Sequence, residues 1–144
     1  MSNFQSKNRR DDTQKSAVVI PSDLGIIEPE KIVEITRDSG RLYAERRITT
    51  SQIRNIFSRI ISIRTDYKKN NKFNDKIKRD LILLKPLLAY AKGRKNNVEP
   101  LQKLLFDCID GVVGDKVQNK EAAMENFFAI VEGIVAFHKF YGGN

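Results

Sequence analysis

The sequence lacks several features on which whole classes of protein depend. Its 144 residues include one cysteine, no tryptophan, four prolines and eight glycines. A single cysteine excludes a disulfide framework within the chain and a zinc site built from cysteine pairs. No stretch approaches the roughly 20 apolar residues that span a bilayer, and the polar start has no apolar signal-peptide core. We therefore expect a cytoplasmic protein with no membrane partner.

Side chains suited to catalysis are equally scarce. His138 is the only histidine and Cys108 the only cysteine, and both fall on the apolar side of a predicted helix. Such positions favour a packed, hydrogen-bonded ring and a buried thiol. Asp107 and Asp110 are a common pair on a solvated helix, whereas two-metal hydrolysis needs several converging carboxylates. The sequence predicts no enzyme, no metal and no cofactor, and leaves one catalytic alternative, a ribonuclease with His138 as its base.

Positive charge is concentrated in the middle of the chain. The net charge is +8. Residues 37–95 hold seventeen Lys or Arg and five Asp or Glu, a net charge of +12, whereas residues 1–36 have a net charge of −1 and residues 96–144 of −3. This distribution indicates a surface for a polyanion, above all nucleic acid. A solvated surface rich in lysine and arginine is the alternative.

The pattern of apolar residues predicts an all-α protein. Apolar residues recur at helical spacing, and no alternation with a period of two appears. We expect a compact bundle of about five helices that forms a single domain over residues 28–144. A mobile N-terminal segment at residues 1–27 is expected to precede it, with a short apolar run at 17–20 that can dock on the body or on a neighbour.

The clearest helix begins after Ile48. Thr49 and Gln52 have the spacing of a capping box, and Ile48 and Ile53 flank it as a hydrophobic staple. The helix fades at the basic run of residues 67–72. One face carries small uncharged side chains that suit either another subunit or solvent: Ser51, Asn55, Ser58 and Ser62.

The remaining helices are expected at defined places. The first begins at Pro29 and is expected to be short or broken at residues 38–40. The third, residues 74–92, is apolar nearly all round, so we expect it to be central in the fold. A fourth opens at Pro100, and the last begins at Asn119.

Arginine and lysine residues at helix ends and flanks are the candidate binding residues. Arg46 and Arg47 precede the capping box and crowd near Arg54, and Arg59 lies on the other flank of the same helix. A planar guanidinium can bridge two phosphate oxygens, so these residues suit phosphate contacts rather than the reading of bases. A second cluster stands where the third helix ends: Lys92, Arg94 and Lys95. Ion pairs within the bundle, or contacts with helix-end carbonyls, are the alternative roles.

Three segments, in their order and spacing, resemble a known family. They are Ile48-Thr-Thr-Ser-Gln-Ile-Arg54, Leu88-Ala-Tyr-Ala-Lys-Gly-Arg94 and Ala136-Phe-His-Lys-Phe-Tyr-Gly-Gly143. The chain resembles the small helical subunit of the Csm effector complex, the type III-A CRISPR–Cas surveillance machine. The segments lie within residues 48–143, about two-thirds of the chain. Lys92 stands where the family pattern has a small residue.

The resemblance implies a function that the residues alone do not show. Family members have no catalytic activity, and two or more copies stack head to tail as an inner filament beside the backbone subunits that hold the guide RNA. They hold the guide–target RNA duplex, whereas other Csm subunits cut RNA and DNA. The implied partners are guide (crRNA) and target RNA, the backbone and large Csm subunits, and further copies of this chain. Arg54, Arg94 and Lys139 are the implied contacts with the RNA backbone.

A DNA-associated regulatory or architectural protein is the alternative function. It predicts that the isolated chain binds duplex DNA. A helix-turn-helix reader places a short recognition helix after a tight turn. Here the basic loop at 67–72 is too long and the following helix too apolar for that arrangement, so we expect a non-catalytic RNA-binding subunit.

Overall fold

The protein is an all-α bundle. The computed structural model describes residues 18–94 and 96–144, and their side chains except at 92–94 and 96. All regular structure in these residues is helical, which confirms the expected fold class. The elements are, in chain order, η1 (Leu24–Ile26), α2 (Pro29–Glu45), α3 (Thr50–Lys68), α4 (Asp75–Arg94), η2 (Asn96–Val98), α5 (Glu99–Val113) and α6 (Lys120–Phe140).

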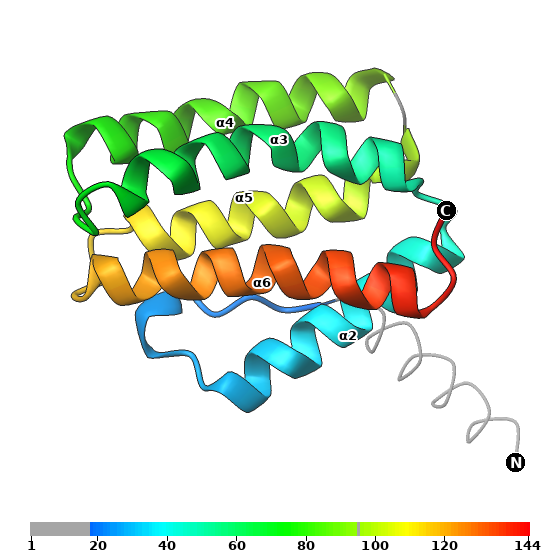
Figure 1. Ribbon diagram of the computed structural model, residues 1–144, viewed down its shortest axis with the longest axis horizontal. Coiled ribbons are helices and arrows are strands. Elements are labelled where there is room, and N and C mark those ends of the chain that lie inside the picture. Colours follow the sequence, from blue (N-terminus) through cyan, green and yellow to red (C-terminus); the bar gives the residue numbers. More distant parts are fainter. Residues whose placement is uncertain (1–17, 95) are drawn as a thin grey trace, which may run out of the picture.

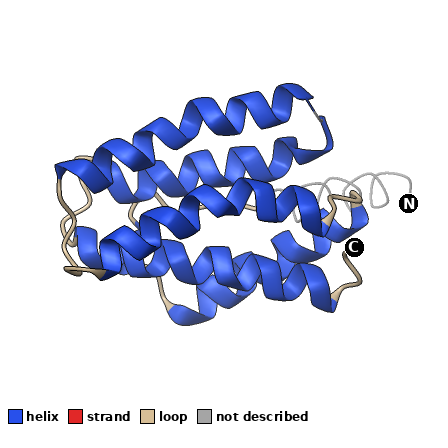
Figure 2. Ribbon diagram, turned by 45° about the horizontal axis from the view of Figure 1, so that its top comes forward, coloured by secondary structure: helices blue, strands red, loops and turns tan. Residues whose placement is uncertain are grey.

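Helices α3 to α6 lie side by side, and the chain reverses direction from each to the next (Figure 1). Helix α6 occupies the central place, because it contacts α2, α3, α5 and η1. Helix α2 crosses α6 on the side away from α4, and the same arrangement is seen in the turned view (Figure 2). Helices α2, α4 and α6 therefore end, and α3 and α5 begin, at one end of the bundle.

The start of α3 follows its sequence signal closely. The Thr49 hydroxyl accepts a hydrogen bond from the Gln52 backbone N–H at 3.1 Å, and the Gln52 side chain accepts one from the Thr49 N–H at 2.9 Å. The capping box is thus complete. Ile48 and Ile53, its hydrophobic staple, are both buried. The cap and the staple together fix where α3 leaves the preceding turn.

The expected break in α2 is wrong. The helix runs without interruption through Asp38, Ser39 and Gly40 to Glu45. Ser39 and Gly40 face the interior rather than ending the helix. A Cβ atom at Gly40 would lie 2.6 Å from the Phe137 Cβ of α6. The glycine is needed because α2 and α6 approach closely there, and packing outweighs its low helix propensity.

The expected central position of α4 is also wrong. One face of α4 packs on α3 and α5, whereas the other faces solvent. That outer face is nonetheless apolar. It carries Ile82, Leu83 and Leu87, which are 41%, 47% and 43% exposed, together with Tyr90 at 68%. The helix lies at the edge of the bundle (Figure 1), and it carries apolar side chains on both its buried and its exposed face.

The described part of the N-terminal segment packs on the bundle. Val18 and Ile20, from the apolar run expected to dock, are partly buried against the core. Leu24 in η1 is fully buried, and its carbonyl accepts a hydrogen bond from the Asn126 side chain of α6 at 2.7 Å. Asp23 caps this turn by accepting from the Gly25 N–H at 2.7 Å. Residues 18–27 thereby cover parts of α5 and α6.

Candidate nucleic-acid interface

One end of the bundle gathers basic residues from distant parts of the sequence. Arg46 and Arg47 form the turn between α2 and α3, Arg54 lies one turn into α3, and Lys139 lies in the last turn of α6. All four side chains are exposed. We call these four residues the basic end. The short turn puts Arg46 and Arg47 at the end of the bundle where α3 begins, and their closeness to Arg54 stays a prediction.

Hydrogen bonds between separate elements fix the basic end. The Asn97 side chain of η2 donates to the Arg47 carbonyl at 3.3 Å and contacts the Gln52 side chain of α3 at 3.2 Å. The His138 Nε2 of α6 lies 2.6 Å from the Ile48 carbonyl oxygen. Arg47 itself has a φ of 60°, which is uncommon for a residue with a side chain. Its turn is therefore held by tertiary contacts to η2, α3 and α6.

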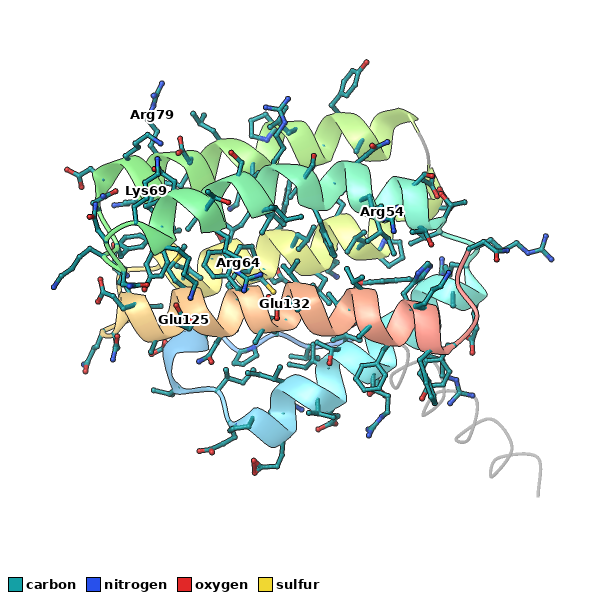
Figure 3. The ribbon with its side chains drawn as sticks, in the orientation of Figure 1. Arg54, Arg64, Lys69, Arg79, Glu125 and Glu132 are labelled. Atoms are coloured by element: carbon teal, nitrogen blue, oxygen red, sulfur yellow. The ribbon has the colours of Figure 1, made fainter. Side chains whose placement is uncertain are left out.

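The arginines of α3 fall into two kinds. Arg64 forms an ion pair with Glu132 of α6, and Lys68 forms one with Glu125 at 3.0 Å. Figure 3 shows Arg64 and Glu132 meeting across the seam of the two helices, with Arg54 further along α3. Among the described residues, Arg54 and Arg59 have no ion-pair partner. The ion pairs therefore neutralise the cations in the second half of α3, whereas Arg54 and Arg59 in the first half keep their positive charge unpaired.

Arg54 also borders a groove between α3 and α6. The groove has a volume of about 510 Å³. Its floor is mostly apolar and includes Ile61 and Val135, which are 57% and 44% exposed. The Arg64–Glu132 ion pair contributes to its lining. The groove therefore combines an apolar floor with a guanidinium group at each of two positions along α3.

Positive charge at the opposite end of the bundle is partly neutralised by ion pairs. Lys76 Nζ lies 2.6 Å from the Asp66 carboxylate and 3.1 Å from that of Asp80. The hydrogen bond from Lys76 holds the pKa of Asp66 below its ordinary value. The same two carboxylates raise the pKa of Lys76. The basic loop at 67–72 thus borders a network of paired charges, whereas Lys72, Lys78 and Arg79 near it are exposed and have no ion-pair partner among the described residues.

Three expected binding residues fall outside the description of side chains. Lys92 and Arg94 belong to α4 by their backbone, but their side chains lie outside the described residues, and Lys95 lies wholly outside them. The backbone of α4 ends at the same end of the bundle as Arg46 and Arg54. The role of these three residues stays a prediction.

His138 and Cys108 occupy structural positions. The His138 ring is 2% exposed, contacts the Ile48 carbonyl and packs under Gly143. Cys108 is fully buried in α5, and burial raises the pKa of its thiol. Neither side chain is open to a substrate in this structure. In the described part of the chain, no three His, Cys, Asp or Glu side chains gather as metal ligands would, and no helix is long and apolar enough to cross a membrane.

The outer face of α4 is the surface feature that sequence reasoning missed. Its apolar residues were visible in the sequence, but they favoured a buried helix. Leu83, Leu87 and Tyr90 are instead exposed on one helix face, a pattern that is typical of contact surfaces. Helical periodicity cannot distinguish burial within the chain from burial by another chain, so the sequence left this distinction open.

The comparison with known proteins agrees with the motifs. The chain has no significant match among the curated proteins or among the solved structures. A family described as Csm2 Type III-A matches residues 27–144, which span all five α-helices of the described chain. The match covers the basic end, the groove between α3 and α6 and the outer face of α4. The chain therefore belongs to the Csm2 family and is a small subunit of the type III-A CRISPR complex.

Proposed function

We propose that this chain is a non-catalytic subunit that stacks as an inner filament within the type III-A complex. In that position it holds the guide–target RNA duplex through contacts with the phosphate backbone, in the cytoplasm. Its partners are guide and target RNA, the backbone and large Csm subunits, and further copies of itself. Arg46, Arg47, Arg54 and Lys139 at the basic end, together with Arg59, are the proposed RNA contacts among the described residues.

The contrast within α3 carries the RNA part of this proposal. Arg54 and Arg59 are exposed and lack an ion-pair partner among the described residues, whereas Arg64 on the same helix is paired with Glu132. An exposed guanidinium without an internal acidic partner keeps its donors free for phosphate oxygens. The small face between Arg54 and Arg59, which includes Asn55 and Ser58, lets a nucleic-acid backbone approach closely.

Two surfaces on opposite sides of the molecule support stacking. The outer face of α4 is apolar and has the exposed cations Lys78 and Arg79 near one end. Across the bundle, the start of α2 carries the exposed acids Glu30 and Glu34 beside Val33, which is 49% exposed (Figure 1). Surfaces of opposite charge on different sides of one molecule favour contact in a head-to-tail sense. Head-to-tail contacts that do not close into a ring generate a filament.

The non-catalytic part of the proposal rests on the state of the two reactive side chains. His138 is held by the Ile48 carbonyl in the interior, and the Cys108 thiol is buried with a raised pKa. A general base must reach the proton that it removes, and a nucleophilic cysteine needs a lowered pKa. The proposed role of this subunit is therefore to bind and position RNA rather than to catalyse a reaction.

A pair of matched variants tests the RNA contact. Arg54→Ala and Arg64→Ala remove the same charge from the same helix, but only Arg64 has an ion-pair partner in the described structure. We expect Arg54→Ala to weaken retention of target RNA by the assembled complex and to lower the salt dependence of binding by about one unit of slope. Arg64→Ala should change the slope much less. Equal effects of the two variants, or none from Arg54→Ala, would contradict the proposal.

A further inference from the structure

Three aromatic side chains form a surface cluster where α6 ends. The rings of Phe137 and Tyr141 are roughly parallel, with centroids 6.4 Å apart and an interplanar angle of 29°. Phe140 stands nearly perpendicular to both, at 87° to Phe137 and 89° to Tyr141. The centroids of Phe140 and Tyr141 are 5.0 Å apart. These edge-to-face contacts hold the Phe140 ring in one orientation although 75% of the residue is exposed.

The base of this cluster is rigid. Phe137 lies against Gly40 of α2, at a place where the two helices approach closely. The end of α6 is fixed by the hydrogen bond from the Gly143 N–H to the His138 carbonyl at 2.8 Å. Gly142, with a φ of 88°, supplies the left-handed turn that this ending requires. An exposed phenylalanine on a fixed base loses little conformational entropy when a flat partner covers it.

One arginine contacts the cluster directly. The Arg41 guanidinium lies 5.9 Å from the centre of the Tyr141 ring. Its Nε contacts the Glu45 carboxylate at 3.2 Å, which neutralises part of that charge. Lys139 is the neighbour of Phe140 in the sequence and is exposed, and Arg46 follows Glu45 at the same end of the bundle. The aromatic rings thus share one end of the molecule with the proposed phosphate contacts.

We propose that this aromatic cluster binds one unstacked nucleobase of single-stranded RNA, with Phe140 as the stacking surface. The inference rests on the proposed RNA-binding function and adds a contact with a base to contacts with phosphates. An exposed aromatic ring beside cations is the combination by which proteins bind single strands without reading their sequence. Stacking uses the π-face that every base has, so the site takes any base. The proposed contact for the phosphate of the bound nucleotide is the exposed Arg41 guanidinium, which lies over the Tyr141 ring.

The positive charge at the cluster favours an RNA base over a protein side chain as the group that covers the Phe140 ring. An apolar protein side chain would cover the Phe140 ring equally well, but it gives no role to the exposed Arg41 guanidinium over the neighbouring Tyr141 ring. A nucleotide satisfies both features, since its base covers the ring and its phosphate meets the guanidinium. A contact with another protein chain becomes the competing outcome of the test.

Binding of the full-length chain to two oligonucleotides tests the inference. One probe is a fluorescent eight-residue oligouridine and the other is the same ribose–phosphate chain without bases, both at one low salt concentration. We expect the unaltered chain to prefer the base-bearing probe by about 5- to 150-fold, the range of one stacked base. Phe140→Ala should abolish that preference, and Phe140→Trp should keep it. Ile26→Ala, which removes an apolar side chain of similar exposure (76%) from η1, is the control and should keep it as well.

Equal affinity of the unaltered chain for both probes, or failure to bind either, would overturn the inference. So would a Phe140→Ala chain that keeps its preference for the base-bearing probe. Loss of Phe140→Ala from the assembled complex, with its base preference unchanged, would identify the cluster as a protein contact. The proposed function is judged separately by Arg54→Ala, because a base-independent phosphate interface can stand without this cluster.

Discussion

Gly40 shows at the scale of one residue how packing overrides local preference. A glycine inside a helix is destabilising relative to alanine by roughly 1 kcal/mol, so its presence argues for a break. In the structure its missing side chain makes room for Phe137 and for the His138 backbone, each 2.6 Å from the position of a Cβ. The sequence displays the glycine, but the helix that approaches it lies almost a hundred residues away.

Gly40→Ala should therefore destabilise the protein despite its gain in helix propensity. The added methyl group would force α2 and α6 apart, and such overpacking costs about 1–3 kcal/mol. Urea unfolding followed by circular dichroism measures the change, with Lys31→Ala as an exposed control on the same helix. A Gly40→Ala chain at least as stable as the unaltered one would show that the two helices separate without cost.

Single residues also show the limit of predicting a binding site from sequence. Arg54 and Arg64 are equivalent in the sequence, since both lie on one helix within a basic segment. Only the structure shows that Arg64 meets Glu132 across the α3–α6 seam while Arg54 does not (Figure 3). The spacing of Glu125 and Glu132 by seven residues signals a charged stripe on α6, but not which basic helix faces it.

At the scale of the element, local signals predicted the ends of helices well. The capping box at Thr49, the N-cap at Asn119 and the proline near the start of α5 are all seen in the structure. These signals act within one turn, so the sequence contains all of their partners. The position of α4 and the continuity of α2 depend on contacts with distant segments, and both predictions were wrong.

The cap of α3 gives a prediction at this scale. Thr49→Ala removes the acceptor for the Gln52 N–H at the turn that carries Arg46 and Arg47. The change should destabilise the protein by about 1 kcal/mol. Thr65→Ala makes the same chemical change on the exposed side of α3, where the hydroxyl only bonds back to the Ile61 carbonyl at 3.0 Å. Urea unfolding should show a clear loss for Thr49→Ala alone, and equal losses would argue against the role of the cap.

At the scale of the whole molecule, two buried groups predict weakness at alkaline pH. Burial raises the pKa of the Cys108 thiol above its ordinary 9.0 and that of the Tyr43 hydroxyl above 10.0. The unfolded chain loses these protons first, so it binds fewer protons than the native state above those values. Stability should be unaffected by these groups below about pH 9 and fall at higher pH, by at most about 1.4 kcal/mol per pH unit for each group.

Urea unfolding at pH 8 and pH 10.5 measures this effect. Cys108→Ala loses some packing, but the further loss of stability between the two pH values should be smaller than in the unaltered chain. A pH dependence identical in the two chains would contradict a contribution from the thiol. The comparison uses the change in the free energy of unfolding between the two pH values. The loss of stability from the cavity is the same at both, so it cancels.

The outer face of α4 and the acidic start of α2 are exposed in the isolated chain. In the proposed stack of copies, each of these surfaces would cover the other. The family match places the chain in the type III-A complex, and the proposed stacking requires more than one copy there. The number of copies per complex therefore tests whether these two surfaces are used as proposed.

Native mass spectrometry of the assembled complex tests this account most directly. The chain would be co-expressed with a tagged set of Csm subunits and guide RNA, and the purified complex weighed with and without Leu83→Glu on the outer face of α4. We predict two or more copies of the chain per complex, and fewer with Leu83→Glu, because the buried charge opposes stacking. Recovery of the unaltered chain only as a free monomer, outside the complex, would contradict the account.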